Sequence, residues 1–140
     1  MANVTYIEDL KVGQVGEYTH QVTEKDIALF AEVSGDHNPI HLDEAYAKTT
    51  MFKGRIAHGM LSAGYISTVL GTVMPGPGAV YMAQNLRFKA PVRIGDKVTA
   101  KCTVQEIDLA KKRVKFETVC LVDGKPVIEG DAMLMVPSRG

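Results

Sequence analysis

One ten-residue stretch, SGDHNPIHLD (residues 34–43), gathers side chains that are able to perform acid–base chemistry. A free aspartate such as Asp36 has a pKa of about 3.9 and is ionised at neutral pH, whereas a free histidine such as His41, at about 6.5, can exchange a proton there. Pro39 prevents one continuous helix, and the stretch does not alternate like a strand. We therefore predict an irregular loop on which a carboxylate and an imidazole hold and activate one water molecule.

Two other interpretations of this stretch stay open. Asp36 and Asn38 are typical turn residues, and Asn38, which precedes Pro39, can bond to its own backbone. His37 and His41 are also metal-ligand types, but Pro39 separates them and no third ligand of known spacing follows, whereas zinc requires three or four ligands. We expect no metal and no cofactor.

A second candidate element is AHGML (residues 57–61), at the start of a long apolar segment that we predict to be a buried helix over residues 59–74. The first N–H groups of a helix have no intrahelical partner, and the helix dipole is positive there. Gly59 has no side chain to block approach, so its N–H is a candidate donor to an oxyanion. Alternatively, Gly59 only permits a tight entry into the helix. We expect His58 to be a helix-cap or core histidine.

The rest of the chain predicts the elements that hold these residues. A strand over residues 15–22 precedes a helix that Thr23 caps, with Asp26 three residues later in a weak capping box. After the long helix, residues 79–92 and three further alternating segments are typical of antiparallel strands, and Asp123-Gly124 indicates a tight hairpin. One long buried helix and about five strands make an α+β fold in which the sheet must wrap the helix.

Composition excludes several classes of protein. The 140 residues predict one domain over 1–140, and 16 basic residues balance 16 acidic ones, which excludes the charge pattern of a nucleic-acid binder. The apolar segment is shorter than the roughly 20 residues of a membrane span. The N-terminus does not resemble a signal peptide, and Cys102 and Cys120 are interpreted as buried free thiols of a reducing compartment. We expect a cytoplasmic protein that binds neither nucleic acid nor membrane.

Three motifs together carry a family resemblance. GDHNPIHLD, then AHGML, then LRFKAPVRIGD resemble the MaoC-like hot-dog hydratases, specifically the (R)-specific enoyl-CoA hydratases. The resemblance covers most of the chain and implies the hot-dog fold, a sheet wrapped around a central helix. It implies that Asp36 and His41 are catalytic and that the backbone N–H of Gly59 is the oxyanion donor.

The reaction that this resemblance implies is hydration of a trans-2-enoyl-CoA to an (R)-3-hydroxyacyl-CoA, and the reverse dehydration. Asp36 would act as the base, and His41 would position the water and help to deliver a proton to C2. Ser62, Ser67 and Leu70 are expected on the central helix, where they either contact the acyl chain or pack in the core. Three basic residues either meet CoA phosphates or are solvated charges of a strand face: Arg87, Lys89 and Arg93.

Two alternative functions share this fold. A hot-dog thioesterase attacks the carbonyl carbon instead of C3, and a non-catalytic module only binds the acyl thioester. The D-x-N-P-x-H pattern argues against both. The strand over residues 79–92 is apolar on both faces at its start, so we expect a homodimer, or an assembly of dimers, that covers it. Alternatively, the N-terminal segment of the same chain shields this strand.

Overall fold

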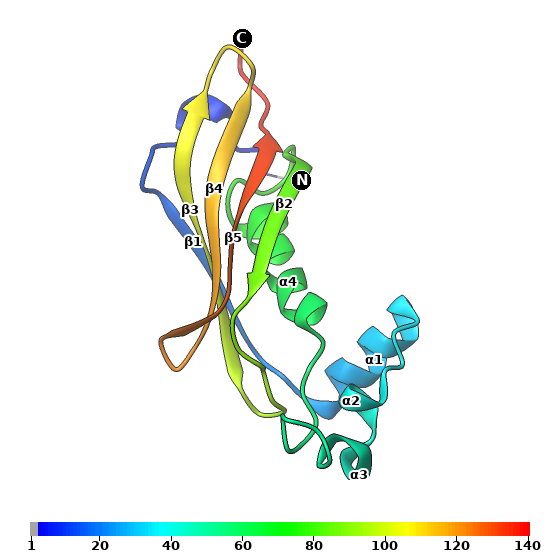
Figure 1. The fold of residues 1–140 in the computed structure, drawn as a ribbon. Helices are drawn as coiled ribbons and strands as arrows, with labels where there is room; N and C mark the ends of the chain where they lie inside the picture. Colours follow the sequence, from blue (N-terminus) through cyan, green and yellow to red (C-terminus); the bar gives the residue numbers. More distant parts are fainter. Residues whose placement is uncertain (1–2) are drawn as a thin grey trace.

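The computed structural model describes residues 3–140, which form a five-stranded antiparallel sheet curled around one helix. Figure 1 shows the sheet as one layer with α4 along its concave side. In chain order the elements are a 3₁₀ turn η1 (Ile7–Asp9), β1 (Val15–Gln21), α1 (Glu24–Ser34), α2 (Pro39–Leu42), α3 (Glu44–Ala47), α4 (Gly59–Thr68), a π-helical turn η2 (Val69–Val73), β2 (Val80–Phe88), β3 (Lys97–Asp108), β4 (Arg113–Val122) and β5 (Lys125–Met135). This confirms the predicted α+β fold.

The strands lie in the order β1-β3-β4-β5-β2, so β1 and β2 are the two edges of the sheet. The chain forms consecutive hairpins from β3 through β5. The predicted turn between β4 and β5 has positive φ at both Asp123 (51°) and Gly124 (75°), the conformation that a type I′ hairpin requires. The predicted strand over residues 79–92 is longer than β2, because Pro91 has no N–H to donate and the chain leaves the ladder after Phe88.

The core lies between α4 and the concave face of the sheet. Alternate residues of β4 are buried, including Val114, Phe116 and Cys120, which is the pattern of a strand with one face on a core. Ile66 and Leu70 fill the space from the helix side and are fully buried. Cys102 and Cys120 are free, buried thiols, as predicted.

The predicted long helix is two elements. α4 ends at Thr68 and continues as the wider turn η2 to Val73. The hydroxyls of Thr68 and Thr72 donate to the carbonyls four residues earlier, at 3.1 and 2.7 Å, and such bonds compete with regular helical hydrogen bonding. Over residues 3–140, no helix reaches the length and apolarity that crossing a membrane would require.

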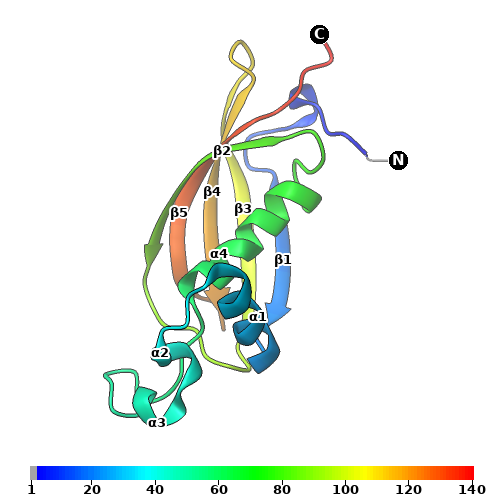
Figure 2. The ribbon, with the colours of Figure 1, turned by 90° about the vertical axis from the view of Figure 1, so that its right-hand side faces the viewer.

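Between β1 and α4 the chain leaves the sheet and forms α1, α2 and α3, which we call the overhang (residues 24–57). Figure 2 shows the overhang beside the start of α4 and away from the opposite end of the sheet. Both motif residues, Asp36 and His41, lie in it. The predicted irregular loop was partly wrong, because Pro39 begins the single turn α2 at its first position, where a missing N–H is tolerated.

Candidate active site

Asp36 is positioned by the end of α1. Thr23 caps the start of this helix, and Asp26 completes the predicted capping box. The helix ends at Gly35, whose φ of 81° is left-handed and suits glycine. Asp36 follows, and its N–H donates to Ser34 Oγ at 3.1 Å while its Oδ1 accepts from the Asn38 N–H at 3.2 Å. The carboxylate therefore extends from a short, internally bonded turn that leaves it exposed.

His41 is positioned by α2 and by the segment before α4. Asn38 caps α2, because its side chain accepts from the Ile40 N–H at 3.0 Å, which confirms its predicted turn role. The Nδ1 of His41 lies 2.8 Å from the carbonyl oxygen of Ile56. A carbonyl only accepts, so Nδ1 carries the proton and Nε2 of the neutral ring carries a lone pair.

His58 connects the two motifs. It occupies the N-cap position of α4 but forms no side-chain cap, and it is only 2% exposed, so the prediction of a core histidine is correct. Its Nε2 donates to the backbone carbonyl of Asp36 at 3.0 Å, and its ring stacks on His41 with centroids 3.8 Å apart. Phe30 of α1 packs on the ring of His58 at 4.8 Å. The helix that carries Gly59 thus contacts both Asp36 and His41 through one residue.

Asp36, His41 and His58 also form a group of metal-ligand types, with one ligand atom of each lying within 4.8 Å of the others. Their geometry does not suit an ion. A ring nitrogen binds zinc in the plane of its ring at about 2 Å. The rings of His41 and His58 are inclined by only 27° and are stacked 3.8 Å apart, so their planes do not meet near both nitrogens.

The environment of His41 keeps its ring neutral. Burial lowers the pKa of His41, and the neighbouring His58 lowers it further, whereas the hydrogen bond to Ile56 and the Asp36 carboxylate oppose this shift. The net direction of the pKa is down. His41 therefore retains the lone pair of Nε2 at neutral pH, which is the form that can accept a proton from water.

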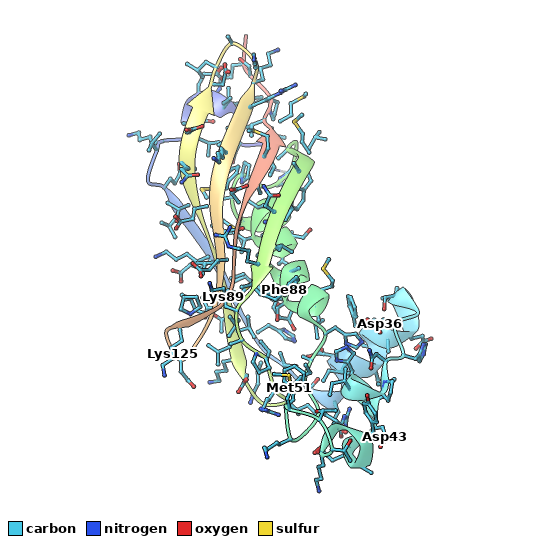
Figure 3. The ribbon with its side chains drawn as sticks, in the orientation of Figure 1. Asp36, Asp43, Met51, Phe88, Lys89 and Lys125 are labelled. Atoms are coloured by element: carbon cyan, nitrogen blue, oxygen red, sulfur yellow. The ribbon has the colours of Figure 1, made fainter. Side chains whose placement is uncertain are left out.

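A cavity of about 510 Å³ opens beside the start of α4. Its wall includes Gly59 and Ser62 from α4, and Phe88 and Lys89 from the end of β2; the remaining lining is largely apolar, from Met51, Phe52, Ile56, Ala57, Met60, Ala90, Pro91, Val92 and Ile128. Figure 3 shows Phe88 and Lys89 at the end of β2, and Met51 within the overhang, which also carries Asp36. An apolar cavity with few polar groups is typical of a small-molecule site.

Gly59 lies directly against an aromatic ring. A Cβ built on Gly59 would lie 2.5 Å from Cε1 of Phe88, a distance that real Cβ atoms do not adopt. The N–H of Gly59 is the first of α4 and has no intrahelical partner. The absence of a side chain therefore permits both the close packing of Phe88 and approach to the helix N-terminus.

The other predicted contact residues lie in different environments. Ser62 is fully buried in the cavity wall, and its hydroxyl has no hydrogen-bond partner among residues 3–140. Ser67 is exposed on α4 and Leu70 is buried in the core, and neither lines the cavity. Arg87 is exposed on β2 and does not line it either, whereas the neighbouring Lys89 does.

The curled sheet, the enclosed helix and the acid–base pair on an overhang define a hot-dog enzyme domain. Residues 10–129 match the family model described as "MaoC like domain". The chain is 60% identical over 135 residues to an (R)-specific enoyl-CoA hydratase of Rhodospirillum rubrum, with 96% of this chain and 94% of the relative covered. It is 47% identical to a 3-hydroxybutyryl-CoA dehydratase of Methylorubrum extorquens, with 97% and 87% covered.

A solved structure gives the same result. The unliganded R-hydratase PhaJ1 of Pseudomonas aeruginosa superposes with a TM-score of 0.91 at 49% identity, covering 97% of this chain and 88% of that one. The chain belongs to the MaoC-like domain family.

Sequence reasoning missed three features of this site. The contact of Phe88 with Gly59 joins residues about thirty positions apart, for which no local pattern exists. The bond from His58 to the Asp36 carbonyl had only one signal, the adjacency of His58 to Gly59 at a helix start. Arg55, whose contacts are described below, had none.

Proposed function

We propose that the chain adds water across the double bond of a trans-2-enoyl-CoA to give an (R)-3-hydroxyacyl-CoA, and catalyses the reverse dehydration, through Asp36, His41 and Gly59. The relatives named above are hydro-lyases of this kind, and this chain is a hydro-lyase of the same family. The stereochemistry follows from the relatives' names and not from the geometry.

One observation carries the mechanism. The bond from His41 Nδ1 to the Ile56 carbonyl leaves Nε2 as an acceptor beside the Asp36 carboxylate. A water molecule between them can donate one hydrogen to each acceptor and direct its oxygen lone pair at C3 of the substrate. Ligand-type atoms of Asp36 and His41 lie within 4.8 Å of each other, and two acceptors that are each about 2.8 Å from one water oxygen fit within that limit.

The steps then balance with water as the only addition. Asp36 takes one proton from the water while its oxygen bonds to C3, and the electron pair of the double bond moves to form an enolate at the thioester. The N–H of Gly59, at the positive end of α4, stabilises the enolate oxygen. The proton returns to C2 through the Asp36–His41 pair, which collapses the enolate and restores both side chains.

The cavity supports an acyl-thioester substrate. It adjoins Gly59, where the thioester oxygen would lie, and its apolar lining suits an acyl or pantetheine chain. Lys89 is the charged residue of its wall and is half exposed, with Glu129 3.7 Å away, so it remains able to meet a phosphate. Ser62 offers an unpaired hydroxyl in the same wall. We assign Ser67, Leu70 and Arg87 no contact within one chain.

An assay with crotonyl-CoA tests this function. We expect loss of the conjugated enoyl absorbance without release of free thiol. Released thiol would mean the thioesterase instead, and binding without either change would mean a non-catalytic module. The same assay over several acyl lengths gives the chain-length preference.

We also propose that the working unit is a homodimer formed through β2. This strand is an edge of the sheet, and it exposes Val80 (55%), Tyr81 (40%) and Met82 (42%). Val4 of the N-terminal segment lies against Gly78, just before β2, but the three β2 residues named above stay exposed within residues 3–140. An exposed apolar edge strand favours pairing with a second copy.

Sedimentation velocity at assay concentrations tests the dimer. We expect a species of twice the monomer mass of 15.2 kDa, or a multiple of it, with activity lost on dissociation. A fully active monomer would rule the dimer out.

A further inference from the structure

Arg55 lies in the segment between α3 and α4 and contacts two elements of the overhang at once. Its Nε donates to the backbone carbonyl of His41 at 2.7 Å, and its Nη1 donates to Glu24 Oε1 at 2.6 Å. The side chain of Arg55 is only 15% exposed, although that of Glu24 is 71% exposed. A guanidinium is planar and always charged, so one rigid group holds both contacts.

These two contacts join the elements that carry the catalytic pair. Glu24 is the first residue of α1, and Asp36 follows the end of that helix; His41 lies in α2. Figure 2 shows these short helices beside one end of the sheet, with α4 running along its face. The relative position of Asp36 and His41 therefore depends on contacts within the overhang.

The residue after Arg55 contacts His41 as well. The Ile56 carbonyl accepts from the imidazole of His41, and the Ile56 N–H donates to the carbonyl of Ile40 at 3.2 Å. Residues 55 and 56 thus hold His41 by its backbone and by its ring. A displacement of this segment would move Nε2 of His41 relative to the Asp36 carboxylate, and small displacements of reacting groups reduce rates strongly.

We propose that Arg55 is a positioning residue of the hydratase reaction, which sets the distance between His41 and Asp36 by bonding the end of α2 to the start of α1. Arg55 does not line the cavity, so its effect is on catalysis and not on substrate binding. This inference rests on the proposed function, because it assumes that Asp36 and His41 carry the reaction.

The variant Arg55→Met keeps the length of the side chain and removes both hydrogen bonds. We expect kcat to fall about tenfold while KM changes less than about threefold, because the substrate contacts remain. Arg55→Lys keeps one charged donor group but loses the planar guanidinium that makes both hydrogen bonds at once. Its kcat should therefore lie between those of the wild type and Arg55→Met. Glu24→Gln should change kcat less than about twofold, because the amide oxygen of glutamine still accepts the bond from Arg55 Nη1 and only the exposed charge is lost.

Arg139→Met is the matched control. Arg139 also forms paired hydrogen bonds with a carboxylate, that of Asp9, but it lies near the C-terminus and away from the overhang. Its loss should leave kcat and KM unchanged. Thermal unfolding of each variant separates a loss of folded protein from a loss of kcat in the folded protein.

The double variant Asp36→Asn/Arg55→Met supplies the decisive readout. Once the Asp36 carboxylate is absent, its distance from His41 no longer affects the rate. Adding the Arg55 substitution to Asp36→Asn should therefore lower kcat by less than about a further twofold. Unchanged kcat in Arg55→Met, an equal loss in Arg139→Met, or full additivity with Asp36→Asn would overturn the inference. If Arg55→Met does not fold, Arg55→Lys is used in the same comparison.

Failure of this inference differs from failure of the proposed function. Inactive Asp36→Asn and His41→Gln with a fully active Arg55→Met would refute only the role of Arg55. Normal turnover in Asp36→Asn or His41→Gln would refute the catalytic pair itself, whatever the Arg55 variants show.

Discussion

The sheet with α4 and the overhang are held together by different forces. Large side chains such as Phe116, Ile66 and Leu70 are completely buried between the sheet and α4, so burial of apolar surface holds that region together. The overhang buries one large apolar side chain completely, that of Ile27, and leaves others exposed, among them Val33 (83%) and Met51 (85%).

The overhang depends more on individual polar contacts. A capping box starts α1, Asn38 and Asp43 cap α2 and α3, and Arg55 joins two of these helices. Such a bond contributes only about 0.5–1.5 kcal/mol to the free energy of unfolding, but it defines a direction, which burial does not. The region that carries stability and the region that carries the acid–base pair are therefore separable by mutation.

The largest expected effect is on the acid–base pair. Asp36→Asn keeps the shape and removes the base, and His41→Gln keeps hydrogen bonding and removes the titrating ring. Each should lower kcat by about 10²-fold or more with a smaller change in KM and little change in the free energy of unfolding, because the loss falls on the transition state. Steady-state kinetics and denaturant unfolding of both variants provide the measurement.

The next largest effect is expected at Gly59, the first residue of α4, in the wall of the cavity. Gly59→Val should lower turnover to about a hundredth and weaken acyl-CoA binding, because the new side chain must displace Phe88 and obstructs approach to the N–H. Crotonyl-CoA kinetics and isothermal titration with a product are the measurements. Normal turnover in this variant would show that the thioester oxygen does not lie at Gly59.

A core substitution should give the opposite result. Phe116→Ala should lower the free energy of unfolding by about 3–5 kcal/mol, because a completely buried ring is replaced by a cavity. The fraction that stays folded should have a kcat within about twofold of the wild type. Ile66→Val, with an expected loss of about 0.5–1.5 kcal/mol, repeats the test in a well-folded variant. A large loss of kcat in Ile66→Val would mean that the core and the site are not separable.

The smallest expected effect is on pH dependence. The pKa of His41 is lowered by burial, so its ring stays neutral below the ordinary value of about 6.5. For a histidine whose pKa is lower in the folded than in the unfolded state, the stabilising contribution is present above the unfolded pKa and is lost as pH falls toward the folded pKa.

Two measurements check this direction. The acid limb of kcat/KM for crotonyl-CoA should have its midpoint below pH 6.5. The free energy of unfolding should decrease as pH falls below 6.5, and His41→Gln should remove that part of the decrease. An acid limb that is centred above pH 6.5 would contradict a neutral, buried His41.

Local signals account for most of what could be predicted. Alternation gave the strands, Thr23 and Asp26 gave the start of α1, and Asp123-Gly124 gave a hairpin with two positive φ angles. Each of these features depends on residues that lie within a few positions of one another, so local backbone and side-chain geometry is enough to produce it. The ends of two predicted elements differ from the structure. The π-helical turn η2 replaced the last part of the predicted helix, and β2 ended before Pro91.

The sequence by itself supplied the candidate residues for the chemistry and most of the elements that carry them. Asp36, His41 and Gly59 were identified from their spacing and their resemblance to one family, and the structure brings Asp36 and His41 together and places Gly59 in the adjoining wall. The tertiary structure alone decided how they are held. The bonds from Arg55 to His41 and Glu24 span 14 and 31 positions, and the bond from His58 to Asp36 spans 22. Contacts between residues so far apart in the sequence form only when the overhang packs against itself and against the start of α4. No periodicity or short motif in the sequence predicts that packing.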